Sequence, residues 1–182
     1  MSHQHRNDDN PKAAGPTDSG QFVGGEDAAA ALPQPTRIPW PPLLITGTVL
    51  GAIGLEMLVP LAWPGVNDTP ARVVGLGFGV IGLFLIGWAA LTLRRHRTTI
   101  MPHRGADRLV TDGPFAWRRN PIYLGDVFIF LCLAEVTKNV WFAILVPVFI
   151  LAVTWLAILP EERHLMARFG DAYKAYKERT RR

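Results

Sequence analysis

The sequence predicts an all-α integral membrane protein with about four transmembrane helices, the last two forming a hairpin, followed by a cytosolic amphipathic helix. Two observations support this fold class. Hydrophobic residues make up 49% of the 182 residues, and they gather into long blocks instead of spreading as the core of a soluble domain would require. Basic residues concentrate in only two of the segments between or after those blocks, as is typical of membrane proteins.

Four apolar blocks are candidates for spans of a bilayer. A hydrocarbon core about 30 Å thick needs roughly 20 helical residues, and the first, second and fourth blocks meet this length. The third is cleanly apolar only from Ile122 to Ala134, so we expect it to tilt, to thin the bilayer or to be shielded by its neighbours. The expected spans are Leu43–Trp63, Ala71–Leu93, Pro121–Lys138 and Val140–Pro160.

The basic residues predict how the chain is oriented. They cluster between the second and third spans and after the fourth span, whereas the other two connections hold only Arg72 and Lys138. Because positive residues stay on the cytoplasmic side, we expect a multi-pass protein of the cell membrane with both termini and the long middle connection in the cytosol. Basic residues beside spans contact anionic lipid headgroups, so the net charge of +4 requires no nucleic-acid partner.

The two ends of the chain are expected to differ. Residues 1–41 are rich in Ala, Gly, Pro, Asp and Gln and should form a disordered cytosolic tail, whereas residues 42–182 form the membrane domain. After the fourth span, Leu165, Phe169 and Tyr173 recur at four-residue steps, which predicts an amphipathic helix along the membrane surface. The glycine at position 170, followed by an aspartate, favours a break in that helix.

No metal site is expected. The single cysteine, Cys132, excludes both a disulfide framework and a metal site built from cysteines. His3 and His5 lie in the tail, where two histidines in an unstructured segment are a weak signal.

A polar cluster, "RRNPIYLG", stands where the third span begins. Asn is a favoured N-cap and Pro a favoured first helical residue, so Asn120-Pro121 has a purely structural explanation. Arg118 and Arg119 would then be lipid anchors, and Tyr123 an interfacial aromatic residue. The same features also suit a ligand, because a helix N-terminus and arginines attract a carboxylate or phosphate. An aromatic ring can face a cation or a planar base.

A second polar cluster, Glu161-Glu162, directly follows the fourth span. It can be explained as a polar stop signal. The two-span hairpin between Tyr123 and Glu161 nevertheless returns it to the membrane face where Arg119 and Asn120 lie. A pocket lined by acid, arginine, helix terminus and aromatic ring suits a zwitterionic cofactor with a cationic centre and a purine.

The two clusters also carry a family resemblance. The order "LVTDGPFAWRRNPIYLG", a two-span hairpin, then "EERHLMARFGDAYKAY" resembles the isoprenylcysteine carboxyl methyltransferase and phospholipid methyltransferase superfamily. Members are integral membrane enzymes that use S-adenosylmethionine, and the resemblance covers roughly Thr99 to Arg182. It implies methyl transfer from S-adenosylmethionine to a lipophilic or lipid acceptor, with membrane lipids as neighbours and no obligate protein partner.

The resemblance also implies a set of site residues. Glu161 would bind the cofactor's ammonium group or ribose hydroxyls, and Arg119 with the start of the third span would hold its carboxylate. Tyr123 and Phe115 would flank the adenine or the sulfonium. Catalytic roles thus fall on Glu161, Arg119 and Tyr123. The implied cofactor-binding residues are Arg108, Leu109, Val110, Phe115, Asn120, Pro121, Ile122, Tyr123, Glu161 and Glu162.

Three departures from the prenylcysteine enzymes bear on the acceptor. Asn120 stands where those enzymes have histidine, and Asn-Pro-x-Tyr is similar to phospholipid N-methyltransferases. Phe115 stands where relatives usually have tyrosine, and Ala157 where the prenylcysteine enzymes place a substrate-side arginine. Together these departures weaken the case for a prenylcysteine carboxylate.

Two further acids lie within expected spans. Intramembrane acids are costly and suggest function, and Asp126 lies one turn from Tyr123 on the same helix face. Asp126 is a candidate site residue or a charge at the edge of the pocket, and Glu56 in the first span is a weaker candidate or an interhelical partner. His96, His103 and His164 are expected at the membrane interface without a role in proton transfer.

Two rival functions remain. Membrane sterol reductases resemble the C-terminal half of this superfamily but use NADPH and have more spans. A non-catalytic membrane protein could retain the same fold for assembly or lipid binding.

Overall fold

A computed structural model describes residues 38–64, 69–96 and 109–182. All described residues belong to one compact unit. The described residues do not include Arg108, His103 or the tail up to residue 37, which contains the two other histidines named above. Within the described part the protein is all-α. Its helices are α2 (Trp40–Leu58), α3 (Thr69–Arg95), η2 (Gly113–Ala116), α4 (Pro121–Thr137), α5 (Val140–Val153), η3 (Thr154–Ile158) and α6 (Leu159–Arg179).

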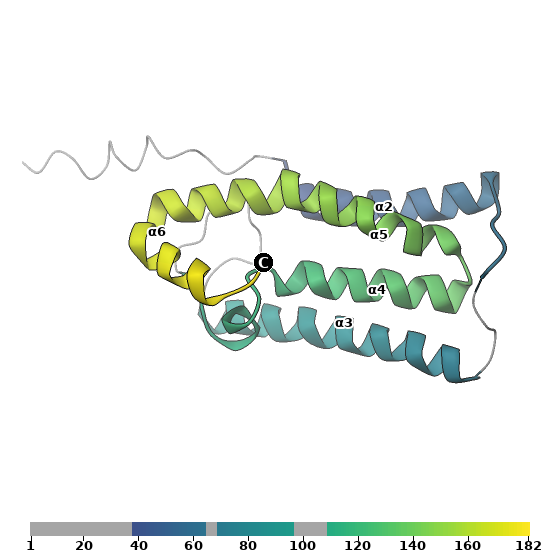
Figure 1. Ribbon diagram of the computed structural model, residues 1–182, viewed down its shortest axis with the longest axis horizontal. Helices are drawn as coiled ribbons and strands as arrows, with labels where there is room; N and C mark the ends of the chain where they lie inside the picture. The colour runs from purple at the N-terminus through teal and green to yellow at the C-terminus, as the bar shows by residue number, and fades with distance from the viewer. Residues whose placement is uncertain (1–37, 65–68, 97–108) are drawn as a thin grey trace, which may run out of the picture. The chain divides into compact units, whose positions relative to one another are not determined.

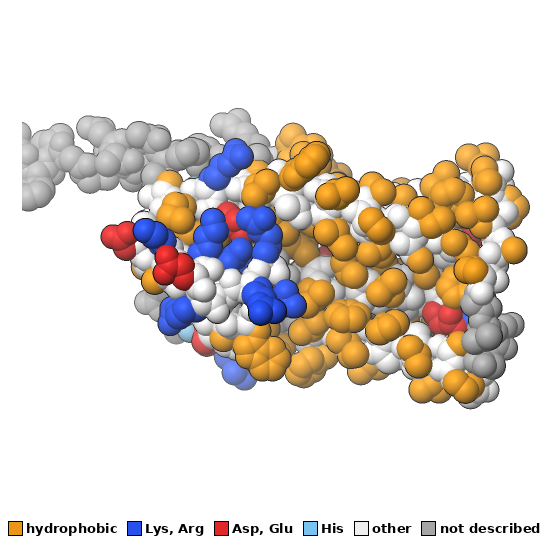
Figure 2. All heavy atoms as spheres, in the orientation of Figure 1, with side chains coloured by type: hydrophobic (Ala, Val, Ile, Leu, Met, Phe, Trp, Pro, Cys, Tyr) orange, Lys and Arg blue, Asp and Glu red, His pale blue; other side chains and the backbone are white. Residues whose placement is uncertain are grey.

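Three of the described helices are long and apolar enough to cross a membrane. They are Trp40–Leu58, Thr69–Arg95 and Val140–Arg179, in which α5, η3 and α6 follow one another without an intervening loop. Helix α4 has 17 residues, which places it at the lower limit of length for a span. Hydrophobic side chains cover most of the α2–α5 face in Figure 2, while Lys and Arg side chains gather over α6 and the start of α4. This is the surface of an all-α membrane protein.

Helices α3 and α4 pack closely because small residues line their contact. Gly75, Gly79 and Gly82 of α3 are buried, as is Gly125 of α4. A Cβ atom added at Gly82 would lie 2.7 Å from the carbonyl oxygen of Gly125. No side chain larger than hydrogen fits there without moving a backbone, so the glycines set the distance between the two helices.

The turn between α4 and α5 is held by specific polar contacts. Lys138 adopts a left-handed conformation, with φ of 54°, and Asn139 then caps α5 by accepting a hydrogen bond from the Trp141 N–H at 2.8 Å. The Asn139 Nδ2 donates to the Ala52 carbonyl oxygen of α2 at 3.0 Å. Beyond the turn, the Phe130 ring packs edge-on against Phe149, with 5.0 Å between ring centroids. These contacts form the α4–α5 hairpin predicted from the sequence.

The hairpin's second arm does not end at Pro160. Residues Thr154–Ile158 form a π-helix, in which the Leu159 N–H donates to the Thr154 carbonyl oxygen, and α6 continues directly from it. Because proline has no N–H to donate, Pro160 cannot complete the hydrogen-bond pattern of a regular α-helix here. Turns of π-helix such as this one are frequent at functional sites. The break expected after Phe169 is confirmed, because Gly170 has a φ of 49° and a non-helical conformation. The end of the chain thereby folds back beside the start of α4 (Figure 1).

Candidate active site

The start of α6 and the segment just before α4 are joined by a buried ion pair. Arg119 donates from Nε to Glu162 Oε1 at 3.1 Å, and the two side chains are 10% and 9% exposed. Glu162 also accepts two hydrogen bonds from Arg182, at 3.1 Å to Oε1 and 2.6 Å to Oε2. Arg119 Nη1 donates to the carbonyl oxygens of Lys177 and Thr180, at 3.0 and 2.8 Å. We call this group of five residues the arginine–glutamate frame.

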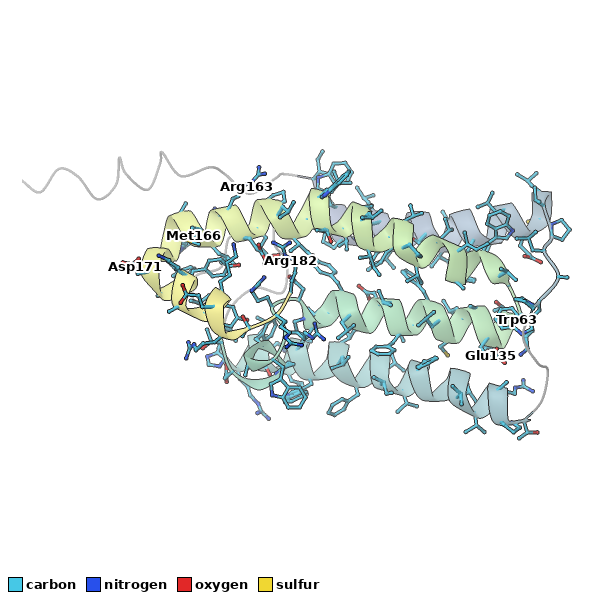
Figure 3. The ribbon with its side chains drawn as sticks, in the orientation of Figure 1. Trp63, Glu135, Arg163, Met166, Asp171 and Arg182 are labelled. Atoms are coloured by element: carbon cyan, nitrogen blue, oxygen red, sulfur yellow. The ribbon has the colours of Figure 1, made fainter. Side chains whose placement is uncertain are left out.

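Backbone and side-chain contacts extend the frame to η2. The Arg119 N–H donates to the Arg181 carbonyl oxygen at 2.9 Å, and the Arg181 N–H donates to the Trp117 carbonyl oxygen at 3.4 Å. The Tyr176 hydroxyl donates to the Phe115 carbonyl oxygen at 2.8 Å. Figure 3 shows Arg182 between α6 and the start of α4. The hydrogen bond to Glu162 raises the pKa of Arg182 above its ordinary value, so the frame keeps its positive charge.

Asn120 stands at the N-cap position of α4 but does not cap it. Its side chain makes no capping hydrogen bond, and its Nδ2 atom is buried without a partner among the described residues. Pro121 follows as the first helical residue and is fully buried. A buried donor without a partner costs free energy, about 1–3 kcal/mol. The local structural explanation therefore accounts for Pro121 but not for the Asn120 amide.

Three acidic or hydroxyl groups near Asn120 are also unpaired. Tyr123, on α4, lies within electrostatic range of the Glu161 and Asp126 carboxylates. In the part of the chain that the structure describes, neither Tyr123 nor Glu161 makes a side-chain hydrogen bond or ion pair. Asp126 is 8% exposed, and its Oδ2 atom is buried without a partner. These four residues, Asn120, Tyr123, Asp126 and Glu161, are called the unpaired set below.

The adjacent glutamates therefore differ in kind. Glu162 is saturated by two arginines, whereas Glu161, one position earlier on α6, has no such partner among the described residues. Successive residues on a helix point about 100° apart, so only one of the pair can face the frame. The hairpin brings both expected polar clusters to one end of the bundle. There, some of their side chains are paired with each other and some are not. The frame joins the elements, whereas the unpaired set has no partner in the described part of the chain.

The other residues implied by the resemblance surround this end. Val110 is 8% exposed, and Leu109 is partly buried beside it. Phe115 and Ile122 are partly buried, and Phe115 contributes its carbonyl oxygen to the frame. Ala157, at the position of the family's arginine, is 6% exposed in the apolar core.

Three residues of the frame were not predicted, and neither was Tyr176, which extends it to η2. Tyr176, Lys177, Thr180 and Arg182 lie far from α4 in the sequence, and the basic residues among them fit the expectation of lipid anchors. No local pattern indicates that the chain folds back at Gly170 far enough to place Arg182 on Glu162. His96, expected at the interface, pairs with Asp112, with 2.9 Å between Nε2 and Oδ1.

The comparison with protein families agrees with this architecture. No curated protein and no solved structure matches the chain significantly. The family model described as phospholipid methyltransferase matches residues 70–172. That range includes both polar clusters, runs from the start of α3 into α6, and covers more than half of the 182 residues. The chain belongs to the phospholipid methyltransferase family.

Proposed function

We propose that this protein is a membrane methyltransferase that moves a methyl group from S-adenosylmethionine to a lipophilic or lipid acceptor. The observation that carries the proposal is the unpaired set, four polar groups at one end of the bundle that have no hydrogen-bond or ion-pair partner among the described side chains. Family membership supports methyl transfer in general. The basic residues around this end favour a cytosolic site.

The unpaired set fits S-adenosylmethionine in its chemistry. Glu161 offers a carboxylate for the cofactor's ammonium group or ribose hydroxyls, and the Asn120 Nδ2 offers a buried donor for its carboxylate. The Tyr123 ring can face a cation such as the sulfonium. When bound, S-adenosylmethionine supplies an electrophilic methyl group on a good leaving group. The residues of the chain then have to align donor and acceptor and exclude water.

Arg119 takes a positioning role in this proposal. Its resemblance-based role was to hold the cofactor's carboxylate, but three of its side-chain hydrogen bonds go to Glu162, Lys177 and Thr180. We therefore assign it to holding α6 against α4, which sets the distance between Glu161 and Asn120. Glu162 and Arg182 serve the same purpose.

Cofactor binding tests the proposal directly. The full chain, purified in detergent, should bind S-adenosylhomocysteine saturably in isothermal titration calorimetry, and should not bind NADPH. Glu161→Gln should weaken that binding at least tenfold, because the carboxylate is lost and the size is kept. Glu178→Gln makes the same change at an exposed position of α6 and should leave binding unchanged.

Each alternative predicts a different result. Tighter binding of NADPH would indicate a membrane reductase, and binding of neither ligand would indicate a non-catalytic protein. The acceptor is then sought by incubating membranes that contain the protein with a labelled methyl donor and separating the extractable lipids. A labelled lipid that disappears in Glu161→Gln membranes is the expected product.

A further inference from the structure

Asp126 is the least exposed residue of the unpaired set. It lies on α4, three residues after Tyr123, in a helix that packs against α3 and α5. Only 8% of the residue is exposed, and its Oδ2 atom has no partner in the described part of the chain. A buried carboxylate is normally paired or hydrogen-bonded. Asp126 therefore has an oxygen that is free, within the described part of the chain, to accept a hydrogen bond or a proton from a ligand.

The position of Asp126 along α4 separates it from the other polar groups. It lies six residues after Asn120, or about 9 Å further along the helix axis at 1.5 Å per residue. One turn beyond it, Phe130 is 2% exposed and packs on Phe149. Asp126 is thus the last polar group of the unpaired set before the aromatic core begins. A lipophilic acceptor that enters from the bilayer would meet this group before it met Asn120 or Glu161.

We propose that Asp126 accepts the proton that the methyl acceptor loses, so that the acceptor is a lipophilic molecule whose reacting nitrogen or oxygen carries a proton. This inference rests on the proposed function. The acceptor's bond to hydrogen breaks, and its proton goes to the Asp126 carboxylate. The electron pair left on the acceptor forms the new bond to the methyl carbon, and the departing thioether keeps the pair of the broken carbon–sulfur bond.

The charges around Asp126 and Glu161 disfavour a carboxylate acceptor. Such an acceptor has no proton to lose and would bring a further negative charge beside Asp126 and Glu161, where a low dielectric strengthens repulsion. The two arginines of the frame, Arg119 and Arg182, hydrogen-bond to Glu162. They are committed to that acid and do not neutralise the unpaired set.

The first experiment measures ligand preference without turnover. The full chain in detergent, saturated with S-adenosylhomocysteine, is titrated with dodecylamine and with dodecanoate, using empty micelles as the blank. The wild type should bind the amine at least tenfold more tightly, and Asp126→Asn should lose that preference. Asp171→Asn makes the same chemical change at an exposed residue of α6, far from Arg182 in Figure 3, and should keep it. Equal binding of both probes by the wild type, or an unchanged preference in Asp126→Asn, overturns the inference.

The second experiment measures methyl transfer from labelled donor to dodecylamine, 4-dodecylphenol and dodecanoate. The amine or the phenol should be methylated and dodecanoate should not. Asp126→Asn should lower kcat at least a hundredfold while its affinity for S-adenosylhomocysteine stays within threefold, and Asp126→Glu should recover part of the rate. Preferential methylation of dodecanoate, or a kcat of Asp126→Asn within threefold of the wild type, overturns the inference. If no probe is methylated, the titration alone decides.

Retained S-adenosylhomocysteine binding also shows that Asp126→Asn is folded. Failure of the wild type to bind that ligand would contradict the proposed function itself. The two failures are therefore distinguishable.

Discussion

Arg119 and Glu162 meet across 43 positions of the chain, with 3.1 Å between Nε and Oε1. The meeting depends on topology, because α4 and the α5–η3–α6 segment run in opposite directions from the turn at Lys138 (Figure 1). Both side chains are about one-tenth exposed, at 10% and 9%. The pair therefore fixes the two elements that carry Asn120 and Glu161. These two residues, each adjacent in sequence to a member of the pair, are the ones that we propose bind a ligand.

The two adjacent glutamates should respond differently to the same substitution. Glu162→Gln removes a buried charge that two arginines share, and breaking a buried pair from one side costs about 3–5 kcal/mol. The lower part of that range is expected, because the Arg182 side chain is 43% exposed and can reach water. Glu161→Gln should change the free energy of unfolding by less than about 1 kcal/mol, since no described ion pair is broken. Reversible unfolding in mixed micelles measures both, and equal losses would contradict this division.

Helix packing between α3 and α4 should depend on the glycine at position 82, because any larger side chain would meet the backbone of α4. Gly82→Ala places a methyl group 2.7 Å from the Gly125 carbonyl oxygen, and overpacking of this kind costs about 1–3 kcal/mol. Gly77→Ala, on the same helix, has nothing within 4 Å of the added carbon and should be neutral or stabilising. Thermal unfolding in detergent compares the two variants. A Gly82→Ala protein as stable as Gly77→Ala would contradict the close approach of the helices.

The general fold could be predicted because it depends on the length and order of the apolar segments, which can be read directly from the sequence. Apolar blocks of sufficient length form spanning helices, and two consecutive spans return the chain to one face of the bilayer. That reasoning was enough to bring Glu161-Glu162 to Asn120-Pro121. It was also enough to identify Gly170 as a break, because glycine readily adopts the positive φ of 49° found there.

The division of the site between Glu161 and Glu162 could not be predicted, because it depends on helix phase. The π-helix Thr154–Ile158 shifts the phase of everything after it, and a pattern with a period of 3.6 residues does not reveal such a shift. The partners of Arg119 were hidden for another reason. Lys177, Thr180 and Arg181 contact Arg119 only because the chain has turned at Gly170. No local sequence rule predicts how far the chain folds back after such a turn.

The two asparagines that precede helices form a natural comparison. Asn139 caps α5 and donates to the Ala52 carbonyl oxygen, whereas Asn120 makes no capping hydrogen bond on α4. Asn139→Ala should therefore lower the free energy of unfolding by about 1–3 kcal/mol, the sum of a cap and a buried hydrogen bond. Asn120→Ala should be neutral or stabilising, because no cap is lost and a buried donor without a described partner is removed. Unfolding in mixed micelles again provides the measurement, and the reverse order would assign the cap to Asn120.

The pair formed by His96 and Asp112 should make a small, pH-dependent contribution to stability. The hydrogen bond with His96 lowers the pKa of Asp112 below its ordinary value of 3.8, against an opposing effect of burial. A carboxyl group with a lowered folded-state pKa stabilises the protein above its unfolded-state pKa, and that stabilisation is lost as the pH falls through the folded-state value.

Asp112→Asn should therefore destabilise the protein at neutral pH and become equal to the wild type once Asp112 is protonated in both states. The neutral-pH difference should stay below about 1 kcal/mol, because the His96 and Asp112 side chains are 39% and 60% exposed. Raising the salt concentration should reduce it further, since exposed charges are screened. Unfolding of wild type and variant is measured at neutral pH and at a pH far enough below 3.8 that Asp112 is protonated in the folded state as well. A difference that persisted at the lower pH would show that Asp112 acts through packing and not through its charge.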